Sequence, residues 1–308
     1  MIKYLILFAA LVLGAPSWIL AKYQVAHAPA EFCVGLRFVF AFAALEIFRR
    51  IIGDKQRKLT ASEWGLIFLQ GLFLHSINLW LCYYSSLYMV SGLIAVTVST
   101  MILPNMIFGQ IFLKVPIRLQ TVIGALLGIF GVCILFGQEI LSFSGDSFVM
   151  LGFSLAFIST FFSVIGTQVS GIVLKRGISI SFCTSRALLI GGLLSLAATV
   201  LKNGTPIIPT APEFWVSILY LGVASSSICY ALYNYLIKNY GPGVASYLWI
   251  AMPGVCLAIS AFYEDYEWTI ASTIGILAIT LGSVFTGSEN HISQKVRNLM
   301  QRVFLSQA

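Results

Sequence analysis

Charged side chains are scarce in this sequence. Asp, Glu, Lys and Arg together make up 9% of its 308 residues, whereas water-soluble domains usually carry about 25%. The mean hydropathy is +0.93, and 59% of the residues are hydrophobic. This composition excludes a soluble enzyme of this size and predicts a protein that is embedded in lipid.

The sequence also lacks the residue patterns of common enzyme and metal sites. Its three histidines, His27, His75 and His291, lie far apart, and its six cysteines form no CxxC pair. Neither a zinc site nor a disulfide framework is therefore predicted. No GxxxxGK motif followed by Ser or Thr is present, which excludes a nucleotide-driven pump within this chain. We expect no enzymatic activity, no metal and no cofactor.

Apolar segments follow one another along the whole chain, and each has about the 20 residues that a helix needs to cross a bilayer. Continuous apolar runs of this length favour helices over barrel strands, because lipid offers backbone amides no hydrogen-bond partner. The predicted fold is an all-α polytopic membrane protein with ten transmembrane helices. Their approximate limits are 2–22, 31–50, 63–88, 91–113, 119–137, 147–172, 180–201, 213–238, 242–263 and 268–286.

Basic residues predict how these helices are oriented. Lys and Arg resist translocation and collect on the cytoplasmic side of a membrane. Starting the chain in the cytoplasm leaves only Lys22 and Lys202 outside, and it puts Arg37 and Arg186 within spans. We therefore expect both termini in the cytoplasm and the protein in a bacterial-type inner membrane. The net charge of +7 then indicates topology and not nucleic-acid binding.

The two halves of the chain carry related landmarks. A shift of 149 residues gives the pairs Arg37–Arg186, Tyr84–Tyr233, Gly92–Gly241 and Pro104–Pro253, and a further slip of two gives Gly124–Gly275 and Gly131–Gly282. The predicted repeat contains five helices, in residues 1–137 and 147–286. Because five is odd, the second copy must enter the membrane from the opposite side, as in many secondary transporters. The remaining segment 287–308 is predicted to be a cytoplasmic amphipathic tail on the inner membrane surface.

Polar residues at helical spacing predict where a solute would bind. In the third span, His75, Asn78, Cys82 and Ser85 are three or four residues apart and share one stripe of the helix, which in lipid must face protein or water. We expect a central cavity walled by the third, fourth, eighth and ninth spans. The candidate substrate-binding residues are Trp18, His75, Asn78, Trp80, Tyr84, Thr97, Thr100, Ser227, Tyr230, Tyr233, Asn234, Tyr247 and Trp249. In the alternative interpretation, the hydroxyls only join helices and the tyrosines form interfacial belts.

Four further residues are candidates for gates or hinges. Arg37 and Arg186 could form paired gates or attract a carboxylate, although snorkelling toward lipid headgroups is the alternative. Pro104 and Pro253 each remove a backbone donor within a span, which favours a bend. His75 could carry a proton or simply pack between helices.

The sequence resembles the drug/metabolite transporter superfamily, in particular its ten-helix EamA branch. The resemblance rests on Leu13-Gly14, the run GLRFVFAFAAL around Arg37, the run YYSSLYMVSGLIAVTVSTMILP ending in Pro104, and Gly124 to Gly131. The chain departs from the family at Leu13, where tryptophan is frequent, and at Lys114 and Val115, where a glutamate is frequent. The resemblance implies movement of amino acids or other small metabolites, often outward.

These observations predict a secondary transporter that moves small organic metabolites, amino acids first, by alternating access. Multidrug efflux is an alternative function, as is uptake of a nucleoside-like metabolite such as S-adenosylmethionine, which aromatic rings would suit. A membrane enzyme or a structural subunit is the alternative from another class. The expected partners are a small-molecule substrate and the lipid bilayer, with no nucleic acid and no obligate protein partner.

Overall fold

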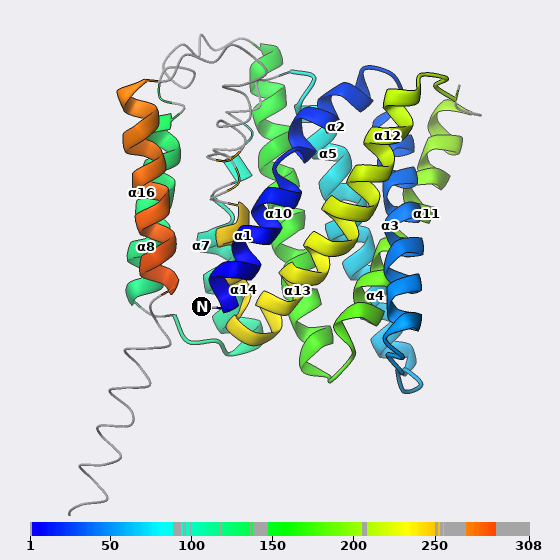
Figure 1. Cartoon of the computed structure of the whole chain (residues 1–308), viewed down its shortest axis with the longest axis horizontal. Coiled ribbons are helices and arrows are strands. Elements are labelled where there is room, and N and C mark those ends of the chain that lie inside the picture. Colours follow the sequence, from blue (N-terminus) through cyan, green and yellow to red (C-terminus); the bar gives the residue numbers. More distant parts are fainter. Residues whose placement is uncertain are drawn as a thin grey trace, which may run out of the picture.

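The computed structural model describes residues 2–88, 94, 97–98, 100–117, 119–135, 137, 147–204, 208–249, 252, 255 and 269–287. Every element in these ranges is a helix, and the helices stand side by side in one bundle (Figure 1). The predicted all-α class is confirmed. The first half holds α1 (Ile2–Gly14), α2 (Ser17–Val25), α3 (Ala30–Ile51), α4 (Ala61–Leu72), η1 (Phe73–Ile77), α5 (Asn78–Ser85), α7 (Ile102–Leu113) and α8 (Leu119–Leu135). The second half holds α10 (Ser147–Lys175), α11 (Ile180–Asn203), α12 (Pro212–Tyr220), η2 (Leu221–Ile228), α13 (Cys229–Tyr240), α14 (Pro242–Ala245) and α16 (Ile270–Gly287).

Equivalent helices of the two halves run in opposite directions. In Figure 1, α3 descends while α11 ascends, and α8 ascends while α16 descends. These opposite directions are those that an inverted repeat requires. The tail 287–308, apart from Gly287, lies outside the described residues.

Within the described residues, five stretches are long and apolar enough to cross a membrane. They are Tyr4–Val25, Ala61–Ser85, Met150–Lys175, Ile180–Lys202 and Pro212–Tyr240. The first of them contains a turn at Ala15 and Pro16 that separates α1 from α2, so the predicted span 2–22 is not one regular helix and extends to Val25. The predicted spans 91–113 and 242–263 lie partly outside the described residues, and the count of ten stays a prediction.

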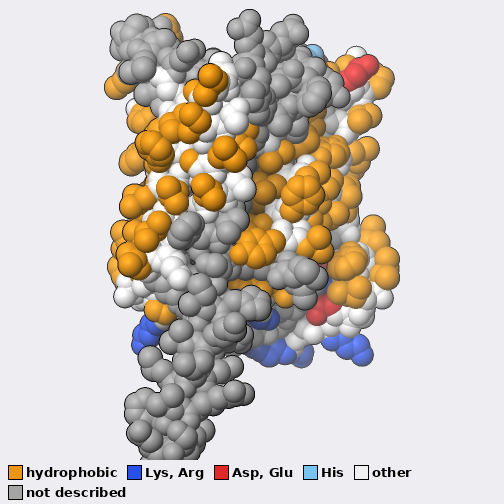
Figure 2. Space-filling view, turned by 60° about the vertical axis from the view of Figure 1, so that its left-hand side comes forward, with side chains coloured by type: hydrophobic (Ala, Val, Ile, Leu, Met, Phe, Trp, Pro, Cys, Tyr) orange, Lys and Arg blue, Asp and Glu red, His pale blue; other side chains and the backbone are white. Residues whose placement is uncertain are grey.

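The outer surface of the bundle is apolar. Figure 2 shows hydrophobic side chains over the middle of the molecule and Lys and Arg gathered at its lower end. Phe8, Leu126 and Phe130 are each more than half exposed. Contiguous exposed apolar surface of this kind is what a lipid-facing protein presents.

Glycines allow α8 and α16 to pack closely. A Cβ added to Gly131 would lie 2.6 Å from the carbonyl oxygen of Gly275, and one added to Gly282 would lie 2.6 Å from that of Gly124. The two contacts are reciprocal, because each joins a glycine of one half to a glycine of the other. Small residues at such crossings are typical of membrane helices, whose backbones can then touch.

Both halves contain a π-helical segment at the same place in the repeat. Segment η1 interrupts the helix that begins at Ala61, and η2 interrupts the helix that begins at Pro212. The shift of 149 residues that pairs the arginines also superposes Phe73–Ile77 on residues 222–226, which lie within η2. Such π-segments are rare and concentrate at functional sites, so this pair directs attention to the residues around them.

Candidate functional site

A cavity lies next to η1 and η2, between the two halves. About 80 Å³ of it is open to the centres of water-sized molecules, and the space between the atoms, open solvent included, is about 820 Å³. Its wall comes from α1, α2, α3, α5, α10, η2 and α13 together with residues 86, 98, 101, 249 and 252. We call it the central cavity.

Arg37 forms the charged part of this wall. It lies in α3 and is only 4% exposed. Its Nε donates to Ser226 Oγ at 2.6 Å, while its terminal nitrogens donate to Tyr83 Oη and Ser225 Oγ, both at 3.3 Å. Gly222 brings η2 against α3, because a Cβ there would lie 2.9 Å from the Arg37 carbonyl oxygen. The π-segment thus places its serines beside the guanidinium.

Another part of the wall is polar but uncharged. Ser159 Oγ of α10 donates to Asn78 Oδ1 of α5 at 2.8 Å. Thr160 and Ser163 extend the same face of α10. This wall offers hydroxyl and amide groups to a solute.

Aromatic and thioether side chains make up the rest of the wall. Tyr230 and Trp249 have ring centroids 6.4 Å apart, and Met101 and Met252 also contact the cavity. Methionine adapts its shape to varied apolar partners. The described lining of the central cavity therefore combines one cation, several hydroxyls and an adaptable apolar surface.

His75 does not contact the central cavity. Its ring lies behind Tyr230, with centroids 4.5 Å apart, and against Phe38 at 5.3 Å. It is fully buried, and neither ring nitrogen has a hydrogen-bond partner among the described residues. Its surroundings are those of a packing residue.

A second cavity opens at the other end of the same helices. It is lined by the ends of α7, α10 and α13, by α14 and by the residues around Val115, with Lys175 and Lys238 among them. Lys and Arg gather at this end of the molecule in Figure 2. We call it the basic-end cavity.

A layer of contacts separates the two cavities. Along α10, Ser163 lines the central cavity, Thr167 and Gln168 follow, and Gly171 lines the basic-end cavity. The hydroxyl oxygens of Thr167 and Tyr233 are 3.1 Å apart, and the Tyr233 ring lies 5.7 Å from that of Trp249.

Beside them, Gln168 Nε2 donates to Asn105 Oδ1 at 2.9 Å, and Asn105 Nδ2 donates to Ser246 Oγ at 2.8 Å. We call these five residues, Asn105, Thr167, Gln168, Tyr233 and Ser246, the barrier layer.

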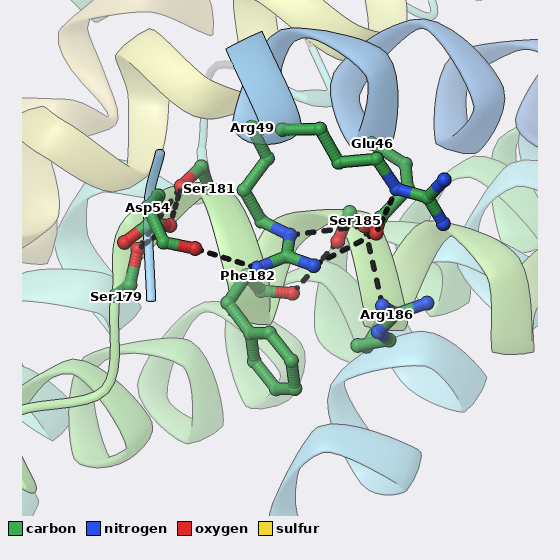
Figure 3. Close-up of polar contacts among 9 residues, drawn as sticks. Glu46, Arg49, Asp54, Ser179, Ser181, Phe182, Ser185 and Arg186 are labelled. Carbon is green, nitrogen blue, oxygen red and sulfur yellow. Dashed lines mark hydrogen bonds and ion pairs between the residues drawn. The ribbon is translucent and has the colours of Figure 1, made fainter. Parts of the chain in front are cut away.

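Ion pairs tie α3 to α11 at both ends. At one end, Lys202 Nζ donates to Glu31 Oε1 at 3.2 Å, and Tyr84 Oη donates to both Glu31 oxygens at 2.7 Å. At the other end, Glu46 of α3 pairs with Arg186 of α11 at 3.2 Å (Figure 3).

Figure 3 also shows that Glu46 forms an ion pair with Arg49 and that Asp54 lies beside Ser179 and Ser181. The Arg49 pair measures 2.7 Å, and both serine hydroxyls donate to Asp54 Oδ2. These contacts extend the ionic link from α3 to the start of α11.

Comparison with known proteins identifies the family. The model of the EamA-like transporter family matches residues 1–137 and again residues 150–288, which is nearly the whole chain in two repeats. The chain belongs to the EamA-like transporter family. The resemblance to the drug/metabolite transporter superfamily is thereby confirmed, and the protein is a multi-pass membrane transporter of small molecules and not an enzyme.

One relative of this EamA-like chain is an uncharacterized transporter of Clostridium kluyveri. The two are 24% identical over 278 residues, which cover 87% of this chain and 86% of the relative. One solved crystal structure superposes with a TM-score of 0.75 at 16% identity, covering 92% of this chain and 96% of the other. That likeness concerns the fold alone.

Of the residues predicted from sequence, Arg37, Asn78, Tyr230 and Trp249 line the central cavity of this EamA-like protein. Tyr233 lies in the barrier layer. Tyr84 and Arg186 belong instead to the ionic contacts at the two ends of α3 and α11. The side chain of Trp18 lies outside the part of the chain that the structure describes, and so does the whole of Pro253.

Other predicted residues bond within or between helices. Trp80 donates to Ser195 at 2.8 Å, Asn234 bonds Ser170 and Thr184, and Ser227 donates to the Val223 carbonyl. Thr97 and Tyr247 are buried, and Thr100 Oγ1 donates to the Thr97 carbonyl. Pro104 lies in the first turn of α7, directly after a turn at residues 100 and 101.

Sequence reasoning missed Ser17, Ser225, Ser159 and Ser163, which line the central cavity. Serine is too common in membrane helices to stand out. The one available signal concerns Ser225, because the shift of 149 residues pairs it with another serine, Ser76.

Proposed function

We propose that this protein carries small organic metabolites, amino acids first, across a bacterial-type inner membrane by alternating access. The proposal includes ten transmembrane helices and cytoplasmic termini. The observation that carries it is the stacking of two cavities along α10 and α13 with the barrier layer between them. A solute held in the central cavity reaches the basic end when the barrier layer parts, and inverted repeats provide the complementary motion at the other end.

Purified protein in liposomes tests this function. We expect downhill flux of amino acids, and Trp249→Ala is expected to lower the flux about tenfold or more, because loss of a large aromatic contact in a binding site costs about 2 kcal/mol or more. Trp64→Ala is the matched control, since Trp64 lies in α4, is 42% exposed and does not contact the cavity. Flux of cationic drugs or S-adenosylmethionine in place of amino acids would favour the alternative substrates. Equal flux in wild type and Trp249→Ala contradicts the proposed route.

The proposed orientation makes a separate prediction. His27 lies exposed between α2 and α3, and Lys58 lies exposed between α3 and α4, at opposite ends of α3. A membrane-impermeant thiol reagent should label His27→Cys in intact cells and Lys58→Cys only after permeabilisation. The unmodified chain serves as control for its own cysteines. Labelling of Lys58→Cys in intact cells would reverse the orientation.

A further inference from the structure

We propose that Arg37 is an anchoring site for a carboxylate, so that the transported solute is an organic carboxylate with an apolar body. This inference rests on the proposed function and names the chemistry of its substrate. It is carried by a buried cation that faces the central cavity and has no acidic partner among the described residues.

The two equivalent arginines of the repeat are an internal comparison. Arg186 pairs with Glu46 at 3.2 Å and does not line the central cavity. Arg37 is more deeply buried, and among the described residues it donates hydrogen bonds to the hydroxyls of Ser226, Tyr83 and Ser225. No carboxylate among the described residues pairs with it. A buried guanidinium is costly unless an anion compensates it, and the open space beside Arg37 is where such an anion fits.

The donors around Arg37 match a carboxylate. A guanidinium has five N–H donors in a planar fork. Hydroxyls of the described residues accept from three of those of Arg37, which leaves two for a ligand. Ser17 and Ser225 line the same part of the cavity, and their hydroxyl oxygens bond each other. One of them donates to the other in this pair, and the hydroxyl that accepts keeps its own O–H for the second carboxylate oxygen. A single guanidinium balances one negative charge, whereas a phosphate dianion would leave one charge buried and unpaired.

The remaining wall defines the rest of the solute. Met101, Met252, Tyr230 and Trp249 offer apolar and aromatic contacts to its body. The described lining contains no acidic side chain that would balance a lone cation. An amino group on the solute would instead meet the hydroxyl and amide wall around Asn78. The site thus accepts an apolar amino acid or a simple organic acid and disfavours a cation that has no carboxylate.

Binding to the purified full-length protein tests the inference with solutes that differ only in the carboxylate. Titration calorimetry would compare phenylacetate with phenylacetamide, and L-leucine with L-leucinamide. In wild type, each carboxylate is expected to bind about 10- to 100-fold more tightly than its amide. Arg37→Gln should remove this preference, and Arg37→Lys should restore part of it, because lysine keeps the charge but loses the planar fork. Arg50→Gln is the matched control on the same helix, since the Arg50 side chain is 77% exposed and outside the cavity.

Equal binding of carboxylate and amide by wild type would overturn the inference without any variant, even if Arg37→Gln fails to fold. A preserved preference in a folded Arg37→Gln protein would also overturn it. Liposome flux separates this result from the proposed function. If the amides are transported and their flux depends on Trp249, the proposed transport function holds and the carboxylate site is overturned. If carboxylates bind but no flux is found, the carboxylate site holds and the transport function is overturned.

Discussion

Replacement of Glu46 by alanine is expected to lower the free energy of unfolding by about 3 kcal/mol. The Glu46 side chain is 8% exposed and pairs with Arg49, Arg50 and Arg186. Its removal leaves Arg49 and Arg186, which are 15% and 22% exposed, without their acidic partner. It also breaks the ion pair that joins α3 to α11 at this end, while the pair of Lys202 with Glu31 at the other end remains. Chemical unfolding in detergent, followed by tryptophan fluorescence, measures the change.

The Arg50→Gln variant is the control for this prediction. Because the Arg50 side chain is 77% exposed, its ion pair with Glu46 should contribute less than about 1 kcal/mol to the free energy of unfolding. Similar losses for Glu46→Ala and Arg50→Gln would mean that the buried part of the cluster contributes no more than the exposed part. That result would contradict the importance of the contact with Arg186.

The second large effect is expected at the contact between α8 and α16. Gly131→Val should cost about 1–3 kcal/mol, because the new Cβ would lie 2.6 Å from a backbone oxygen of α16 that cannot move away alone. Gly282→Val should cost a similar amount, since its contact with α8 is the reciprocal one. Gly65→Val is the control, because no atom lies within 4 Å of a Cβ there. The monodisperse fraction in size-exclusion chromatography and the unfolding midpoint measure the loss, and a Gly131 variant as stable as the Gly65 variant would refute the close contact.

Periodicity and composition predicted the helices, because a lipid environment leaves a long apolar run no other regular structure. The self-comparison also paired Gly131 with Gly282, and the structure shows both at the same crossing. The roles of Arg37 and Arg186 could not be separated in this way. Their difference depends on Glu46, whose contact with Arg186 is made across 140 residues of sequence.

The π-segments and the cavity serines were also beyond sequence reasoning. A π-turn differs from an α-turn by one residue in the hydrogen-bond ladder, and hydropathy is blind to that difference. Segment η2 nevertheless directs Ser225 and Ser226 toward Arg37. The polar stripe around Asn78 can be read from residue spacing, and Asn78 lines the cavity. The serines beside Arg37 are placed by the π-helical segment η2, which residue spacing does not predict.

The reciprocal glycine contact of α8 and α16 has the symmetry of a homodimer interface, in which the same patch is used twice. A single copy of the repeat, inserted into the membrane in both orientations, would present this patch twice and pair through it. Gene duplication and fusion would then preserve an existing quaternary contact inside one polypeptide. Co-expression of the two halves as separate chains should accordingly reassemble them through these glycines.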